Sequence, residues 1–336
     1  MPVFVRTQEI EHAIGPQGRF AMRVTSPDVE IKGSDDPVAR VRVTLELRAD
    51  SEAEADELLD HARFLVKEGD GTLEVTEPRH GETGLNALAR IFGMGRSTTA
   101  AVAVEVPRGA EVEYNGVSAD VTATDLNGAQ HYQTVSGDLV LERVSGSVRI
   151  RGVSADASLR ADSPVTLEAN SVSGDLSAFA PEFGPLLVST VSGDIELEGA
   201  LDEGSGHRIE TVSGDLSLGV VGGLTLEVRG LSTDVDINIP HRAEGSRDRR
   251  RYVVGAGEPQ VLFSSMSGDV SLRGARRGDA VPPHPPAPPV PPRAPDARRS
   301  AAPDAEGQLA VLRALERGEI DIDEASRRLT GGLDDV

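Results

Sequence analysis

The chain contains no cysteine and no tryptophan among its 336 residues, and it has only seven phenylalanines and three tyrosines. The lack of cysteine excludes disulfide frameworks, thiolate metal sites, iron–sulfur clusters and cysteine nucleophiles. A compact α/β enzyme core normally uses more aromatic bulk, because rings bury large apolar areas. The apolar residues are instead mainly valine, leucine, isoleucine and alanine, which suit thin, repetitive β layers.

Positive charge is also scarce, because 34 lysines and arginines face 55 acidic residues and the net charge is −21. Nucleic-acid binding normally needs a basic footprint, so we expect no nucleic-acid partner. No apolar run approaches the ~20 residues that a membrane helix needs, and residues 1–10 lack the regions of a signal peptide. We therefore expect a soluble, cytoplasmic protein, which could still reach a membrane peripherally through a partner.

The most informative feature is a six-residue phrase, centred on Val-Ser-Gly-Asp-Leu, that recurs along the chain. Its serines are Ser118, Ser136, Ser154, Ser173, Ser192, Ser213, Ser232 and Ser267. The first six steps between them are 18 to 21 residues long. A short strand plus a turn takes about nine or ten residues, so one step holds two strands. The repeat predicts a mainly β fold over residues 111–278: a β-solenoid, or β-helix-like stack of two-strand coils of about 19 residues.

Period-two alternation inside each copy supports strands with one buried phase. Around Ser213, for example, one phase carries Val212, Leu216 and Leu218. On this pattern we expect the valines of the phrase to stack in the interior. These valines are Val135, Val153, Val172, Val191 and Val212.

The aspartates of the phrase pose the main chemical question. If they stack one per coil, their charges lie ~4.8 Å apart and repel by about 1 kcal/mol even in water. One interpretation is a calcium or other ligand site on the repeated Ser/Asp face, at Asp138, Asp175, Asp194 and Asp215. The favoured interpretation is that each aspartate caps its own turn. The phrase lacks the paired loops and second acid that a calcium-binding β-roll needs.

No other cluster indicates catalysis, a cofactor or a metal. The serines of the repeat are equivalent to one another, and the seven histidines have no ligand spacing. We therefore expect no enzyme, no catalytic residues and no cofactor. The basic run Arg247, Arg249, Arg250 and Arg251 is a candidate patch for an anionic partner, with a solvated loop as the alternative.

The flanking segments complete the organisation. Residues 1–110 are predicted to be the β-rich N-terminal part of the same solenoid domain, with one helix at about residues 51–65 that begins with a capping box. Residues 279–306 form a Pro/Ala-rich linker, which favours an extended spacer. Residues 307–336, hereafter the C-terminal segment, are predicted to be a small helical hairpin with an apolar face of Leu309, Leu312, Leu315 and Leu329. About 30 residues cannot form a stable core alone, so this segment is expected to dock on another copy or on a protein partner.

The reiterated phrase resembles the bacterial adhesin-like "toastrack" β-solenoid family, a domain of unknown function, over roughly residues 1–275. The C-terminal segment resembles the short helical module (SHOCT-like) found beside such solenoids. The resemblance implies a non-enzymatic scaffold or interaction protein, linked to envelope-stress sensing or assembly. It supplies no catalytic residues. A ligand- or calcium-binding module stays open as the alternative.

Overall fold

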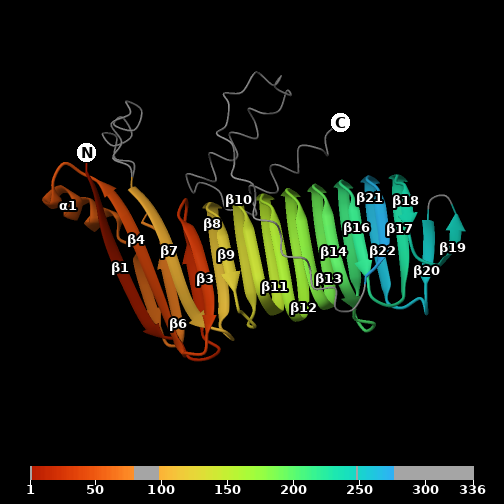
Figure 1. Cartoon of the computed structure of the whole chain (residues 1–336), viewed down its shortest axis with the longest axis horizontal. Coiled ribbons are helices and arrows are strands. Elements are labelled where there is room, and N and C mark those ends of the chain that lie inside the picture. Colours follow the sequence, from red (N-terminus) through yellow and green to blue (C-terminus); the bar gives the residue numbers. More distant parts are fainter. Residues whose placement is uncertain (1, 79–97, 247–248, 276–336) are drawn as a thin grey trace, which may run out of the picture. The chain divides into compact units, whose positions relative to one another are not determined.

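The computed structural model describes residues 2–78, 98–246 and 249–275 (Figure 1). The chain divides into Met1–Ala275 and Arg276–Val336. The expected linker and C-terminal segment therefore lie outside the described residues. The described part holds 22 strands and one helix, and that helix is too short to cross a membrane.

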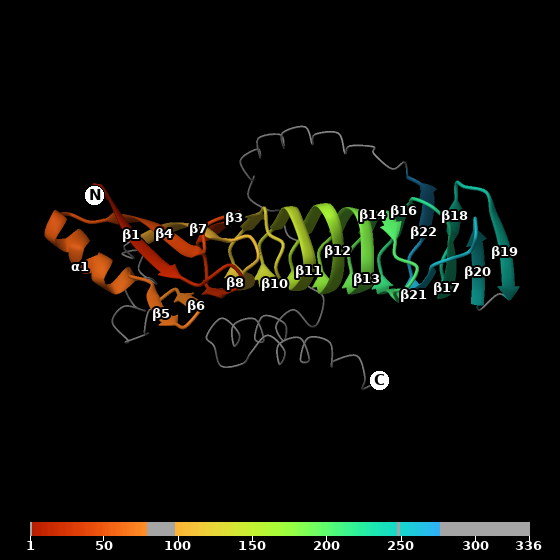
Figure 2. The same ribbon diagram turned by 90° about the horizontal axis from the view of Figure 1, so that it is seen from below.

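The strands form two walls that face each other across a narrow core. Figure 2 shows β8 and β10 on one side and β14, β16 and β22 on the other. In spatial order, wall A contains β5 (Leu65–Gly69), β6 (Thr72–Thr76), β2 (Arg19–Arg23), β8 (Glu111–Ser118), β10 (Gln130–Ser136), the second halves of β11 (Leu139–Ser154), β12 (Ala157–Ser173) and β13 (Leu176–Ser192), then β15 (His207–Ser213), β21 (Gln260–Ser267), β17 (Leu224–Ser232), β20 (Arg249–Val254) and β19 (His241–Ser246).

Wall B faces wall A, and from β9 onward its strands directly follow the Ser-x-Asp turns of the repeat. In spatial order it contains β1 (Val3–Ala13), β4 (Val38–Arg48), β7 (Thr98–Pro107), β3 (Asp28–Ser34), β9 (Val121–Thr124), the first halves of β11, β12 and β13, then β14 (Ile195–Leu201), β16 (Leu216–Val220), β22 (Val270–Gly274) and β18 (Val235–Ile237). Neighbouring coils pair in parallel, so each residue of the phrase lies beside the same residue of the next copy. The predicted mainly β solenoid is confirmed.

Both ends of the solenoid depart from parallel stacking. At the N-terminal end, β1, β4 and β7 pair antiparallel, and α1 (Glu52–Ala62) packs against β1 and β4. Ser51 caps α1, because its hydroxyl accepts a hydrogen bond from the Glu54 N–H. Gln8 ties β1 to the end of the helix by exchanging two hydrogen bonds with the Phe64 backbone. At the other end β20 and β19 form an antiparallel hairpin beside β17.

The last coil in the chain is not the last coil in space. Strand β21 pairs with β15 on one side and with β17 on the other, and β22 lies between β16 and β18. The coil of β21 and β22 is therefore inserted between two coils that are consecutive in sequence. After β18 the chain forms the hairpin of β19 and β20, and it then returns to place β21 between β15 and β17.

The expected interior position of the phrase valines is wrong for three of the five. Val212 is 41% exposed, and Val172 and Val191 are only half-buried. Val135 and Val153 are buried but lie outside the main core cluster. In three of the five copies the residue before the valine is buried, and these residues are Thr134, Thr190 and Thr211. The alternation breaks because the chain turns from wall A to wall B directly after the valine, so the phase before the turn does not continue into the leucine that follows it.

Candidate functional site

The repeated Ser-x-Asp turns, in which x is glycine, alanine or threonine, line up along one edge of the solenoid. We call this edge the serine–aspartate corner. It consists of the turns 118–120, 136–138, 154–156, 173–175, 192–194, 213–215, 267–269 and 232–234, in spatial order. The serines are paired in register from coil to coil. Equivalent side chains of successive coils are therefore stacked at the strand spacing of about 4.8 Å.

The aspartates bind the neighbouring coil and not their own turn. At seven positions one carboxylate oxygen accepts a hydrogen bond from the backbone N–H of an aspartate in the next coil. These bonds run from Asp120 to Asp28, Asp138 to Asp120, Asp175 to Asp156, Asp194 to Asp175, Asp215 to Asp194, Asp269 to Asp215 and Asp234 to Asp269, at 2.8–3.3 Å. The side chain thus satisfies a backbone donor that the turn leaves outside the strand ladder.

Hydroxyl groups reinforce the same edge from both sides. On the outside, Ser136 donates to Ser118 at 3.4 Å and Ser173 donates to Ser154 at 3.3 Å. On the inside, the buried Thr134 hydroxyl donates to the Ser136 carbonyl at 3.1 Å. The two serine bonds therefore join neighbouring coils, whereas the threonine bond braces its own turn.

Negative charge in the row of stacked aspartates affects the pKa of Asp138. Partial burial, with repulsion from Asp120 and Asp156, raises the pKa of Asp138 above its usual value. Because the folded-state pKa lies above the unfolded one, protonated Asp138 favours the folded chain. That contribution is present at acidic pH and is lost as the pH rises through the folded-state pKa.

At the C-terminal coils the corner forms an open depression of about 500 Å³. Only serine, glycine and aspartate line it, at Asp175, Ser192, Gly193, Asp194, Ser213, Gly214, Asp215, Ser232, Ser267, Gly268 and Asp269. Among the described residues no group of three acidic, histidine or cysteine side chains is arranged to hold a metal ion. The structure brings Asp175, Asp194 and Asp215 into one row, but each of them already accepts a backbone hydrogen bond from the next coil.

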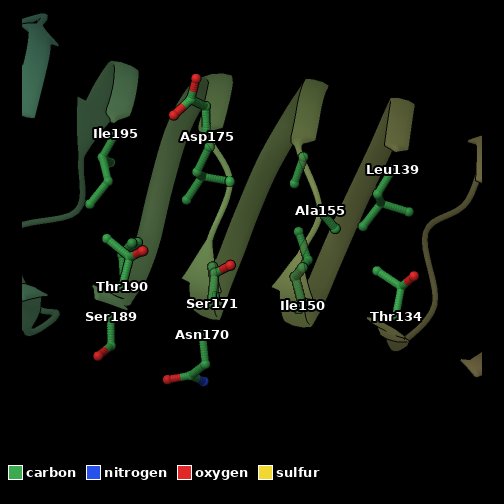
Figure 3. Close-up of a pocket in the computed structure, with 16 residues that line it drawn as sticks. Thr134, Leu139, Ile150, Ala155, Asn170, Ser171, Asp175, Ser189, Thr190 and Ile195 are labelled. Carbon is green, nitrogen blue, oxygen red and sulfur yellow. The ribbon is translucent and has the colours of Figure 1, made fainter. Parts of the chain in front are cut away.

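A second hollow lies inside the solenoid, between the coils of β11, β12 and β13 (Figure 3). Figure 3 shows Thr134, Ser171 and Thr190 along one side and Leu139 and Ile195 on the other. Its volume is about 30 Å³, which is room for a water molecule and too little for an organic ligand. The interior is a packing core rather than a binding cavity.

The predicted basic patch is only partly described. Arg250 donates to the Thr233 carbonyl at 2.6 Å and so helps to fix the end of the solenoid. Arg251 is exposed on β20. Arg247 and the side chain of Arg249 lie outside the described part, as do Leu309, Leu312, Leu315 and Leu329.

Sequence reasoning missed an exposed apolar patch on the outer side of wall A. Leu187 on β13, Val212 on β15 and Met266 on β21 are 45%, 41% and 56% exposed. Half-exposed Val191 and Leu262 lie beside them on β13 and β21. The signal for these residues was present, because Val191, Val212 and Met266 all occupy the same place in the phrase, but that place was assigned to the core.

We expect Asp194→Ala to lower the free energy of unfolding by about 1 kcal/mol, because the Asp215 N–H loses its acceptor. Asp194→Asn retains an oxygen at the same place and removes one charge from the row, so its effect should stay within about 0.5 kcal/mol. Urea denaturation of both variants measures the difference. Equal losses in the two variants would show that the charge matters and the acceptor does not.

No curated protein matches the chain. Among solved structures, a "putative lipid binding protein" from Parabacteroides distasonis is 12% identical, with 81% of this chain and 97% of that chain covered and a TM-score of 0.41. A "putative adhesin" from Bacteroides fragilis is 11% identical, with 80% and 97% covered and a TM-score of 0.31.

There is also a match to a family model. It runs from residue 19 to residue 273, and so takes in β2 at its start, the serine–aspartate corner, and the inserted coil of β21 and β22. Strand β1 precedes the matched residues, and strands of both walls from β2 to β21 fall within them. The chain belongs to the Toastrack DUF4097 family.

Proposed function

We propose that the protein is a non-enzymatic scaffold that binds other protein chains. The observation that carries the proposal is that polar side chains of the repeat form hydrogen bonds between neighbouring coils. Carboxylates of the phrase, such as those of Asp175 and Asp194, bind backbone N–H groups of the next coil. Side chains engaged in this way make a stiff rod with long outer surfaces, which suits a protein that presents binding surfaces.

The setting of this scaffold is part of the proposal. The family resemblance supports a role in bacterial envelope-stress sensing or assembly. The proposal places the chain in the cytoplasm, where it reaches the membrane peripherally through another protein. The net charge of −21 argues against a nucleic-acid partner. The proposal includes no cofactor.

The C-terminal segment supplies the proposed means of association. Its leucine face is too small for an independent core, and a proline-rich linker joins it to the solenoid. A short amphipathic segment on a spacer gains stability by laying its apolar face on another surface. We therefore propose that Leu309, Leu312, Leu315 and Leu329 bind a second copy of the chain or a protein partner.

The test is the double variant Leu312→Asp with Leu315→Asp. We expect it to weaken self-association or partner capture by more than about tenfold, because two charges replace buried apolar groups. The thermal stability of the solenoid should be unchanged. Light scattering and a pull-down from the native host measure the first effect, and a melting curve measures the second.

The matched control is Leu312→Met with Leu315→Met, which keeps an apolar face of similar volume. It should associate like the unaltered chain. If the aspartate variant associates normally while the solenoid melts earlier, the segment stabilises its own chain and the docking proposal is wrong.

A further inference from the structure

The apolar patch on wall A has the form of a short two-row platform. Leu187, Arg208 and Leu262 are paired in register across β13, β15 and β21 and form one row. Val191, Val212 and Met266 form the other, each directly before a paired serine of the corner. The rows are four residues apart along the strands, or about 13 Å, and successive strands are about 4.8 Å apart. These dimensions match the contact face of one helix, which is about 10 Å across.

The charged residues on the platform form an ion pair with each other. Arg208 and Glu210 lie on the same strand and pair with each other, with the guanidinium nitrogen 2.5 Å from the carboxylate. Between the rows the remaining positions are Ser189 and Ser264, which are small. The exposed part of the patch therefore consists of uncharged or internally paired side chains. Contiguous exposed apolar side chains of this kind mark interaction sites.

We propose that this patch binds the C-terminal segment of a second copy of the chain. The inference rests on the proposed function and identifies the surface that receives the leucine face. If the segment is helical as predicted, Leu309, Leu312 and Leu315 recur every three residues, a rise of about 4.5 Å, close to the strand-to-strand step of the patch. On such a helix Arg313 would lie at the margin of the leucine face, whereas Glu316 would lie on the face itself, one turn after Leu312.

The occupant comes from another copy because of where the described chain ends. Ala275 follows β22 on wall B, whereas the patch lies on the outer side of wall A. The chain then continues toward the proline-rich linker, which favours an extended spacer of about 3.1 Å per residue. An extended spacer would have to bend sharply around the edge of the solenoid to bring the segment back to wall A of its own chain, so we take the occupant from a second copy.

The experiment mixes two variants of the full-length chain. The patch variant is Leu187→Ser with Met266→Ser, and the tail variant is Leu312→Asp with Leu315→Asp. We expect each alone to lose self-association by more than about tenfold. A tagged patch variant should capture the untagged tail variant, because the mixture restores one intact tail and one intact patch.

A matched control is Val3→Ser with Val5→Ser, which alters two exposed apolar residues on β1 at the other end of the solenoid. It should associate like the unaltered chain, and melting curves should show that all these variants fold. If the patch variant still self-associates while the tail variant does not, the patch proposal is overturned and the proposed function stands. If the tail variant self-associates and captures partners normally, both fail. A chain that is monomeric at all concentrations, with its tail protected from protease only when the patch is intact, would overturn docking on a second copy.

Discussion

The variant Phe263→Ala is expected to lose about 3–5 kcal/mol of free energy of unfolding. Phe263 is fully buried on β21, in register with Ile209 of β15 and Val228 of β17. Its ring joins the inserted coil to both of its neighbours. Removing the ring leaves a cavity that a narrow core of paired strands cannot close by a small shift.

The loss should be uneven along the chain, because the inserted coil separates the terminal strands from the rest of the solenoid. Strands β17 to β20 contact the preceding coils through β21 and β22. We expect their amide protons to exchange faster in the variant, while those of β8 and β10 keep their protection. Hydrogen exchange measured together with chemical denaturation tests both statements.

Met266→Ala is the control on the same strand. Its side chain is 56% exposed on the outer side of wall A, so its truncation should cost less than about 1 kcal/mol. Equal losses for Phe263 and Met266 would mean that the inward and outward sides of β21 are assigned wrongly. Uniform exchange along the chain would mean that the inserted coil is no weaker a junction than the others.

The repeat period was enough to predict the solenoid, because a fixed step of two strands leaves few other ways to stack equivalent units. The helix near residue 51 was also predictable, since Ser51 and Glu54 form a local capping signal. The order of the last coils could not be predicted from the sequence. Whether β21 lies beyond β17 or between β15 and β17 depends on the return made by β19 and β20, and no local pattern encodes that choice.

The corner shows a different limit of sequence reasoning. The position of the aspartates at a turn followed from the phrase, but the identity of their hydrogen-bond partners depended on how one turn stacks on the next. The same stacking decides the side of the valines. Val212 and Leu216 share a phase in the sequence, yet Val212 is exposed and Leu216 is fully buried, because the turn lies between them.

The glycine of the phrase gives the other large expected effect. In Gly193→Ala the new methyl group would lie 2.2 Å from the Gly174 carbonyl oxygen, which belongs to the backbone of the adjacent coil. The φ of Gly193 is also +141°, a conformation that other residues rarely adopt. We expect the variant to lose about 2–4 kcal/mol of free energy of unfolding, since the two coils must separate or the turn must change conformation.

Gly206→Ala is the control, because no atom lies within 4 Å of the added methyl group and its φ is not left-handed. Its effect should stay within about 0.5 kcal/mol, and urea denaturation of the two variants measures the difference. The comparison decides what the repeated glycine does. A large loss at Gly193 alone means that the residue lets the coils approach closely enough for Asp194 to donate its N–H to Asp175 and for its carboxylate to accept from Asp215. A small loss would mean that the turn relaxes easily, and close stacking would then not account for the glycine in the phrase.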